Sequence, residues 1–169
     1  MKSEVTPDIL KRIIDKLESH RINYLVIAGF GLDGRRGFLT RSHQDIDILC
    51  LKEDIKEIER IIQELGYSGE KHNNMYKVYG EDSGKIDFGM LEIEGNEAVS
   101  YGRIAITRFP KELFEKPQKG KINDIEFNIA PNELLKIWGE SSGQKQDSEY
   151  VKSIKVDEEV MKKIKRELR

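Results

Sequence analysis

Two acidic residues at the start of an apolar stretch are the strongest candidates for chemistry. Asp45 and Asp47 open the run Asp-Ile-Asp-Ile-Leu-Cys-Leu, which ends at Leu51. Successive side chains of a strand point to opposite faces, so both carboxylates lie on one face, roughly 6.5 to 7 Å apart. Carboxylates held in this way can bind a divalent metal. The pair is therefore a candidate metal-binding site.

The surroundings of this pair matter more than its spacing, because acidic residues two apart recur elsewhere in the chain. Ile46, Ile48 and Cys50 alternate with the two aspartates and are expected to enter the core. Charge on a strand that is otherwise buried needs a partner. A structural ion pair would meet that need, but we favour a functional pair.

A glycine-rich segment precedes the acidic strand. The continuous apolar run from Tyr24 to Ala28 predicts a strand that is buried on both faces. Gly29-Phe30-Gly31 is expected to end it, and Leu32 to Phe38 to form a short turn of helix. Glycines let backbone N–H groups approach an anion closely, and a helix start adds its positive end. The segment is therefore a candidate anion site.

Helices and short strands surround these motifs. Capping residues and apolar spacing predict four helices, over about residues 7 to 20, 53 to 65, 131 to 138 and 157 to 168. Glu140 to Gln146 is expected to be a loop. Strands are predicted over residues 75 to 79, 85 to 91, 102 to 107 and 125 to 129, and the first two form a hairpin. In that hairpin Asp87 alternates with Ile86 and Phe88, which places a third carboxylate on a polar strand face.

Length and composition limit the possible functions. The 169 residues suit one domain, and 36% of them are charged. The formal net charge of −2 gives no electrostatic case for binding long nucleic acid, although it leaves room for a local basic pocket. Cys50 is the single cysteine, which excludes an internal disulfide. No membrane-spanning run and no secretion signal is visible, so we expect a cytoplasmic protein.

Taken together, these residues resemble the nucleotidyltransferases of the DNA polymerase beta type, most closely the small bacterial enzymes that act on lincosamides and aminoglycosides. The family signature has a Gly-Gly or Gly-Ser turn after a strand, then T-R-x-H-x-D-I-D, then a third acid on a later strand. Residues 28 to 33 match the first part, with Phe30 where the pattern has Gly or Ser. Thr40 to Asp47 matches the second part, and Asp87 is the natural third acid.

The resemblance implies a fold as well as a site. It is strongest over residues 20 to 66 and predicts an α+β fold in which a mixed sheet is flanked by helices. The whole chain, residues 1 to 169, would be a single nucleotidyltransferase-like domain. Its motif core would span about residues 20 to 92, and its C-terminal helical part about residues 131 to 169.

The resemblance also implies Mg²⁺ and an NTP. Asp45 and Asp47 would bind one or two Mg²⁺ ions, and Asp87 would share the second ion or act as general base. The product would be a nucleotidylated small molecule or protein, together with pyrophosphate. The candidate phosphate contacts, which combine backbone N–H groups with cations, are Gly29, Phe30, Gly31, Arg41 and Lys145.

Other interpretations stay open at this point. The chain could be a catalytically idle binding module, such as the antitoxin-like partner of a toxin, or it could form a homodimer. Arg41 and His43 could pair with neighbouring acids instead of contacting a ligand. Trp138 is predicted to pack in the core, and Arg35 and Arg36 are predicted to be solvated. His20 and His72 are expected at the surface.

Overall fold

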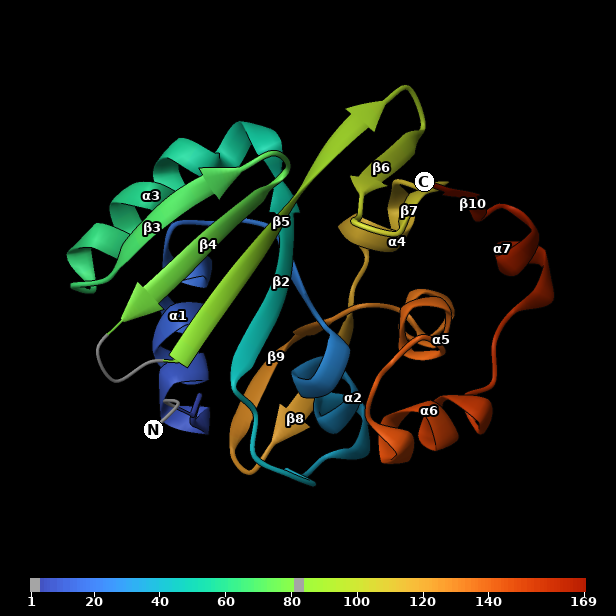
Figure 1. Cartoon of the computed structure of the whole chain (residues 1–169), viewed down its shortest axis with the longest axis horizontal. Coiled ribbons are helices and arrows are strands. Elements are labelled where there is room, and N and C mark those ends of the chain that lie inside the picture. Colours follow the sequence, from blue (N-terminus) through green and yellow to red (C-terminus); the bar gives the residue numbers. More distant parts are fainter. Residues whose placement is uncertain (1–3, 81–83) are drawn as a thin grey trace.

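The computed structural model describes residues 4–80 and 84–169. Within these ranges, ten strands form one mixed sheet with helices on both sides (Figure 1). The predicted α+β fold is thereby confirmed. The strands are β1 (Tyr24–Ile27), β2 (Asp45–Leu51), β3 (Ser68–His72), β4 (Met75–Gly80), β5 (Gly84–Glu94), β6 (Glu97–Tyr101), β7 (Ala105–Pro110), β8 (Gln118–Ile122), β9 (Ile125–Ile129) and β10 (Lys165–Leu168). The helices are α1 (Pro7–Ser19), α2 (Ala28–Arg36), α3 (Ile55–Glu64), α4 (Glu112–Glu115), α5 (Asn132–Gly139), α6 (Lys145–Lys152) and α7 (Glu158–Lys162), with a 3₁₀ turn η1 at Lys52–Asp54.

The order of the strands decides which motifs become neighbours. Along the sheet the order is β10-β7-β6-β5-β2-β1-β9-β8. β2 runs parallel to β5 and antiparallel to β1. The long strand β5 pairs with β4 along its first half and with β6 along its second half. The acidic strand β2 therefore lies in the middle of the sheet, between the glycine motif and the strand that carries Asp87.

One face of β2 and β5 belongs to the core. Ile46, Ile48 and Cys50 are fully buried, as the alternation predicts. They belong to one apolar cluster together with residues of α1 and α3, whose apolar stripes are buried. α1 and α3 lie on one side of the strands in Figure 1, and α2, α5 and α6 lie on the other. On the opposite face, the first two positions of each strand are polar, with Asp45 and Asp47 on β2 beside Lys85 and Asp87 on β5.

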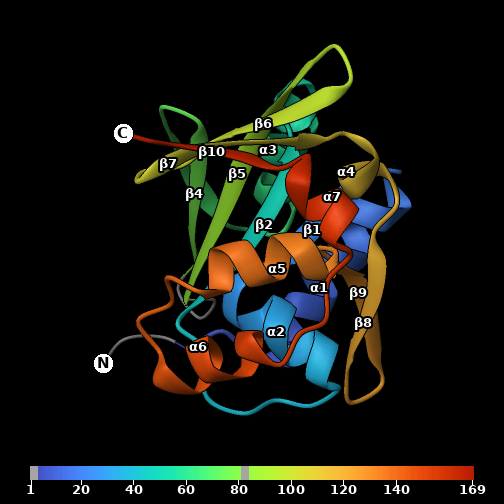
Figure 2. The ribbon, with the colours of Figure 1, turned by 90° about the vertical axis from the view of Figure 1, so that its right-hand side faces the viewer.

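The C-terminal segment departs from the sequence prediction. A helix was expected from 157 to 168, but α7 ends at Lys162 and β10 pairs with β7, which places Lys165 opposite Arg108. Figure 2 shows β10 lying alongside β7. A short helix has little stability of its own. The edge of β7 offers unpaired backbone groups, and pairing with them gives the segment hydrogen bonds to the sheet.

Other elements were misplaced or missed. The strand expected at residues 102 to 107 is β7, which begins later because Gly102 lies in the turn before it and donates its N–H to the Ala105 carbonyl. The β4–β5 hairpin is confirmed, although residues 81 to 83 of its predicted turn lie outside the described residues. β3, β6, β8 and α6 carried no periodicity that we recognised. No described helix has the length and apolar character needed to cross a membrane.

Candidate active site

Neighbouring parallel strands bring the three predicted aspartates to one face of the sheet. Asp47 on β2 is the direct partner of Asp87 on β5, and Asp45 is the partner of Lys85. Direct partners on adjacent strands carry their side chains on the same face, and so do residues two apart on one strand. Asp45 is exposed, Asp47 is half-buried, and Asp87 is only 6% exposed. The site is thus a cluster of three carboxylates and one lysine, in which exposure decreases from Asp45 to Asp47 to Asp87.

The charges in this cluster are only partly balanced. Lys85 Nζ lies 3.1 Å from Asp87 Oδ2, whereas Asp87 Oδ1 is buried and has no hydrogen-bond partner. Burial, followed by the charges of Asp45 and Asp87, raises the pKa of Asp47 to about 7, and Lys85 opposes this rise. Burial lowers the pKa of Lys85, but its contact with Asp87 outweighs burial and the net shift is upward. A divalent cation would relieve both the crowded charge and the unpartnered oxygen.

The three carboxylates suit a metal ion because of their ligand type and because they lie on the same face of the sheet. Among the residues that the structure describes, no three His, Cys, Asp or Glu side chains already surround a metal position. The donor set of Asp45, Asp47 and Asp87 nevertheless consists of the hard carboxylate oxygens that Mg²⁺ prefers. The orphan oxygen of Asp87 has no partner in the protein, so it can serve either as a metal ligand or as the acceptor of a substrate proton.

The glycine motif begins a helix directly beside Asp47. Ile27, the last residue of β1, is the partner of Asp47, and α2 begins at Ala28. Ala28 adopts a left-handed conformation with φ 57°, which turns the chain from strand to helix within one residue. The prediction of a glycine turn before the helix is therefore wrong. Gly29, Phe30 and Gly31 form the first turn of α2, where free N–H groups are found.

Close packing explains the two glycines. A Cβ atom at Gly29 would lie 2.6 Å from Nδ1 of His43 and 2.8 Å from Nη2 of Arg41. At Gly31, a Cβ atom would lie 2.8 Å from the Val26 carbonyl oxygen. α2 can therefore contact β1 and the T-R-x-H segment only because these side chains are absent. Phe30 is 1% exposed, and its ring centroid lies 4.3 Å from that of His43, so its side chain is part of the core.

Asp33, which sequence reasoning passed over, holds the motif loop in place. Its carboxylate accepts hydrogen bonds from Nε2 of His43 at 2.8 Å and from Thr40, through the backbone N–H at 3.0 Å and Oγ1 at 2.7 Å. Burial raises its pKa, but the hydrogen bonds from His43 and Thr40 outweigh burial and leave it below the usual value. His43 therefore pairs with an acid, as one of the two interpretations held. An acid seven residues before the T-R-x-H segment was the available signal.

A second carboxylate joins α6 to the same loop. Asp147 lies 3.2 Å from Nη1 of Arg36 and 3.0 Å from Nη2 of Arg41, and it is 2% exposed. The prediction that Arg36 is solvated is wrong: its side chain is 10% exposed, pairs also with Asp33, and stacks on the Tyr150 ring. Arg35, which was also predicted to be solvated, donates hydrogen bonds to Asn132 and Tyr150. Its side chain is therefore bound to two partners as well.

The two remaining candidate phosphate contacts, Arg41 and Lys145, lie in different environments. Arg41 packs against Gly29, and its Nε is buried without a hydrogen-bond partner. Lys145 is 89% exposed on α6, and its ion pair is with Glu149 at 3.9 Å. The structure thus brings Arg41 to the glycine corner and leaves Lys145 directed into solvent. A phosphate contact by Lys145 stays a prediction.

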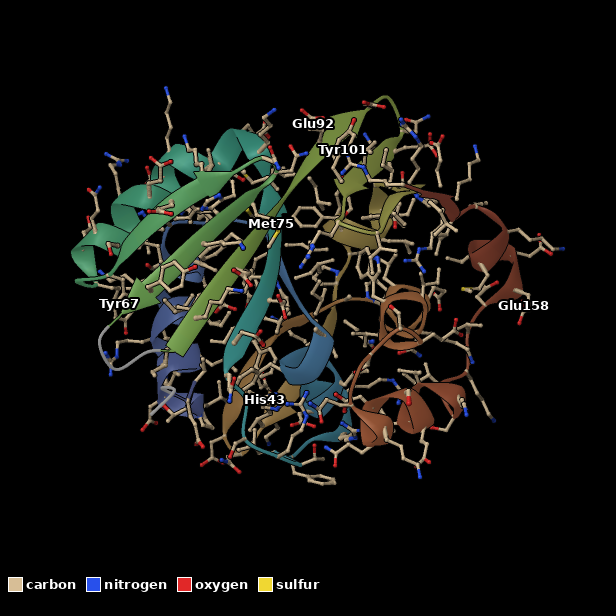
Figure 3. All side chains as sticks on the ribbon, in the orientation of Figure 1. His43, Tyr67, Met75, Glu92, Tyr101 and Glu158 are labelled. Carbon is tan, nitrogen blue, oxygen red and sulfur yellow. The ribbon has the colours of Figure 1, made fainter. Side chains whose placement is uncertain are left out.

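A cavity of about 210 Å³ opens beside the carboxylates. Asp47 and Asp87 lie at one end, and the side chains around the rest are mainly apolar, including Met75, Tyr101 and Trp138. Figure 3 shows Met75 and Tyr101 toward the upper part of the sheet and His43 at its lower end. Trp138 packs its edge on Phe109, with ring centroids 6.1 Å apart, so it serves the core and the cavity wall together.

Comparison with known families identifies this arrangement. A family model described as aminoglycoside-2''-adenylyltransferase matches residues 9–126, which is more than half of the chain. The chain belongs to this family. Its predicted place among the nucleotidyltransferases, close to those that modify antibiotics, is confirmed, and so is the prediction that it is an enzyme. No curated protein matches the sequence.

Solved structures of the same fold extend over nearly the whole chain. The lincosamide adenylyltransferase LnuA with bound lincomycin matches with a TM-score of 0.71 and 20% identity, covering 90% of this chain and 100% of that one. ANT(2'')-Ia in complex with adenylyl-2''-tobramycin matches with a TM-score of 0.62 and 16% identity, covering 87% of each chain. A putative nucleotidyltransferase from Thermotoga maritima has a TM-score of 0.53 and 16% identity, covering 89% of this chain and 94% of that one. At these identities the likeness is one of fold.

Proposed function

We propose that this adenylyltransferase-family member transfers a nucleoside monophosphate from an NTP to a hydroxyl of a small molecule and releases pyrophosphate. The observation that carries the proposal is the pairing of Asp47 with Asp87, which leaves one buried carboxylate oxygen of Asp87 without a partner. The similar structures support a small acceptor, because LnuA holds lincomycin and ANT(2'')-Ia holds an adenylylated tobramycin.

The carboxylates would divide the work according to their exposure. Asp45 and Asp47 would hold Mg²⁺, which when bound would neutralise charge on the reacting phosphates. Asp87 is the most buried of the three, and Lys85 engages its Oδ2. Its Oδ1 is therefore free to accept the proton of the acceptor hydroxyl. As that hydroxyl oxygen bonds to the α-phosphorus, the bond from the α-phosphorus to the bridging oxygen of pyrophosphate breaks.

The triphosphate would lie at the start of α2. Ile27 is the partner of Asp47, so the first N–H groups of the helix are next to the metal-binding strand. A helix N-terminus favours anions through its free N–H groups and its dipole. Arg41 supports this placement, because it packs on Gly29 and has an unpartnered buried Nε. ATP is the first NTP to test, since the matching family is described by adenylyl transfer.

Calorimetry with α,β-methylene-ATP tests the proposal before any acceptor is known. We expect the wild-type chain to bind this analogue in an Mg²⁺-dependent manner and D47N to bind it at least about tenfold more weakly. D15N is the matched control, because the Asp15 side chain is exposed on the outer face of α1 and pairs with Lys11. If the wild-type chain shows no Mg²⁺-dependent binding, the proposal is wrong. An idle binding module or antitoxin-like partner would then explain the fold.

A further inference from the structure

Two hollows next to the carboxylates form one continuous groove. The 210 Å³ cavity adjoins a second hollow of about 480 Å³, and Asn74, Met75, Tyr101 and Gly102 line both. Asp47 and Asp87 lie at the inner end. The outer end is lined by basic side chains, namely His72, Lys77, Arg103 and Arg169. We call the whole surface the basic groove.

The outer end of the basic groove carries uncompensated positive charge. Within residues 4–80 and 84–169, Lys77, Arg103 and Arg169 form no ion pair with an Asp or Glu side chain. Asp47 and Asp87 are the only acids among the residues that line the groove, and both belong to the metal end. His72 is different, because it pairs with Glu70 at 3.0 Å. Three cationic side chains therefore line a hollow whose lining contains no Asp or Glu.

Three separate segments bring these cations together. Lys77 on β4 is the direct partner of Asp87, so both side chains project from the same face of neighbouring strands. Arg103 belongs to the turn between β6 and β7. Arg169 follows β10, and its backbone N–H bonds to the Ile104 carbonyl while Nη1 donates to the Gly102 carbonyl at 3.1 Å. The pairing of β10 with β7, which the sequence did not predict, thus positions Arg169 at the groove.

The order of the strands separates the basic groove from the proposed triphosphate position. From Lys77 the sequence of neighbours is β4, β5, β2, β1 and then α2. The carboxylates on β5 and β2 therefore lie between the basic end of the groove and the glycine corner, and the cavity itself extends as far as Ile27 beside that corner. Phosphoryl transfer places the attacking oxygen and the leaving group in line on opposite sides of the phosphorus. With the triphosphate at the start of α2, an acceptor that attacks from the opposite side would lie toward the basic end of the groove.

We propose that the basic groove selects an anionic acceptor with an apolar body, with its hydroxyl at Asp87 and its carboxylate or phosphate group at Lys77, Arg103 and Arg169. The apolar body fits the cavity walled by Met75, Tyr101 and Trp138. This inference rests on the proposed transfer reaction and adds its substrate class. Aminoglycosides carry several ammonium groups, so the three cations repel them. The family description therefore does not extend to the acceptor of this chain.

Matched probes test the charge preference. The set is 3-(4-hydroxyphenyl)propanoate, its uncharged amide, 2-(4-hydroxyphenyl)ethyl phosphate and tobramycin, each titrated into protein with Mg²⁺ and α,β-methylene-ATP. We expect at least one of the two anionic probes to bind about tenfold more tightly than the amide, with a smaller difference at high salt, and tobramycin to bind more weakly than the amide. The carboxylate and phosphate probes identify which anion fits. Equal binding of all phenols, tighter binding of tobramycin, or no binding of either anion overturns the proposal.

Charge-removing variants locate the preference. K77M and the double variant R103Q/R169Q should each weaken the tighter-binding anionic probe several-fold and leave the amide unchanged. K11Q is the matched control, because Lys11 is exposed on α1 and pairs with Asp15. If the variants weaken nucleotide binding instead, the cations serve the triphosphate and the inference fails. Nucleotide binding that persists in the wild type and is lost in D47N would leave the transfer reaction standing even then.

Discussion

Asp47 and Asp87 are direct partners on the parallel strands β2 and β5, although forty positions separate them in the chain. The pairing places both carboxylates on the face opposite the buried Ile46 and Ile48. It also places Asp87, whose Oδ1 is buried and has no hydrogen-bond partner, at the inner end of the basic groove. The metal-binding and proton-accepting roles that we propose both depend on this single register.

D87N should separate nucleotide binding from transfer. Because Oδ1 of Asp87 is assigned to the acceptor proton, we expect Mg²⁺-dependent binding of α,β-methylene-ATP to change little. Pyrophosphate release from ATP in the presence of an acceptor should fall by about 10²–10⁴-fold. D45N should reduce both quantities. Nucleotide binding by D87N that is as weak as that of D45N would instead make Asp87 a metal ligand.

Metal-free stability should depend on the protonation of Asp47. Burial and the charges of Asp45 and Asp87 raise the pKa of Asp47 from 3.8 to about 7. Between these values the folded chain keeps a proton that the unfolded chain has lost. The resulting stabilisation is complete below pH 3.8 and disappears as the pH rises through about 7.

D47N cannot ionise, so it should lose this pH dependence. In EDTA, wild-type stability should fall relative to D47N between pH 5 and pH 8, by about 2–3 kcal/mol. Adding Mg²⁺ at pH 8 should restore the wild type and leave D47N unchanged. Urea titrations at each pH measure the difference. Parallel stability curves for the two proteins would show that Asp47 does not titrate in this window.

D33N should destabilise the chain strongly. The carboxylate of Asp33 is fully buried and accepts from His43, Thr40 and Arg36, so removing its charge leaves these donors poorly paired. Breaking a buried ion pair costs about 3–5 kcal/mol. D15N, which changes an exposed pair, should cost less than about 1 kcal/mol. Urea unfolding compares the two variants, and similar losses would remove Asp33 from its structural role.

Gly31→Ala should disturb the contact between α2 and β1. The added methyl group would lie 2.8 Å from the Val26 carbonyl oxygen, and backbone cannot move aside as a flexible side chain can. We expect a loss of about 1–3 kcal/mol from overpacking. Gly143→Ala is the matched control, because a Cβ atom there meets nothing within 4 Å. Thermal melting distinguishes them, and a stable G31A would mean that α2 can shift away from β1.

Local patterns were sufficient for the helices and strands with strong periodicity. Thr6 caps α1, the apolar stripe of α3 is buried, and α5 begins at Asn132. Each of these features depends on residues within a few positions of one another. The same holds for Asp45 and Asp47, since the alternation of one strand puts them on one face. The T-R-x-H-x-D-I-D motif is also a local pattern, and it was enough to indicate the family.

Contacts between distant segments were decided by the tertiary structure. β10 pairs with β7 because a free sheet edge outweighs the weak helical preference of a short segment. Asp147 lies in a polar run without strong periodicity, yet its pairing with Arg36 and Arg41 docks α6 on the motif loop. The basic groove depends on strand register and chain path together. The sequence by itself determined the acidic strand and the family of the protein. Which residues surround that strand was decided only by the tertiary structure, because folding brings together segments that are far apart in the chain.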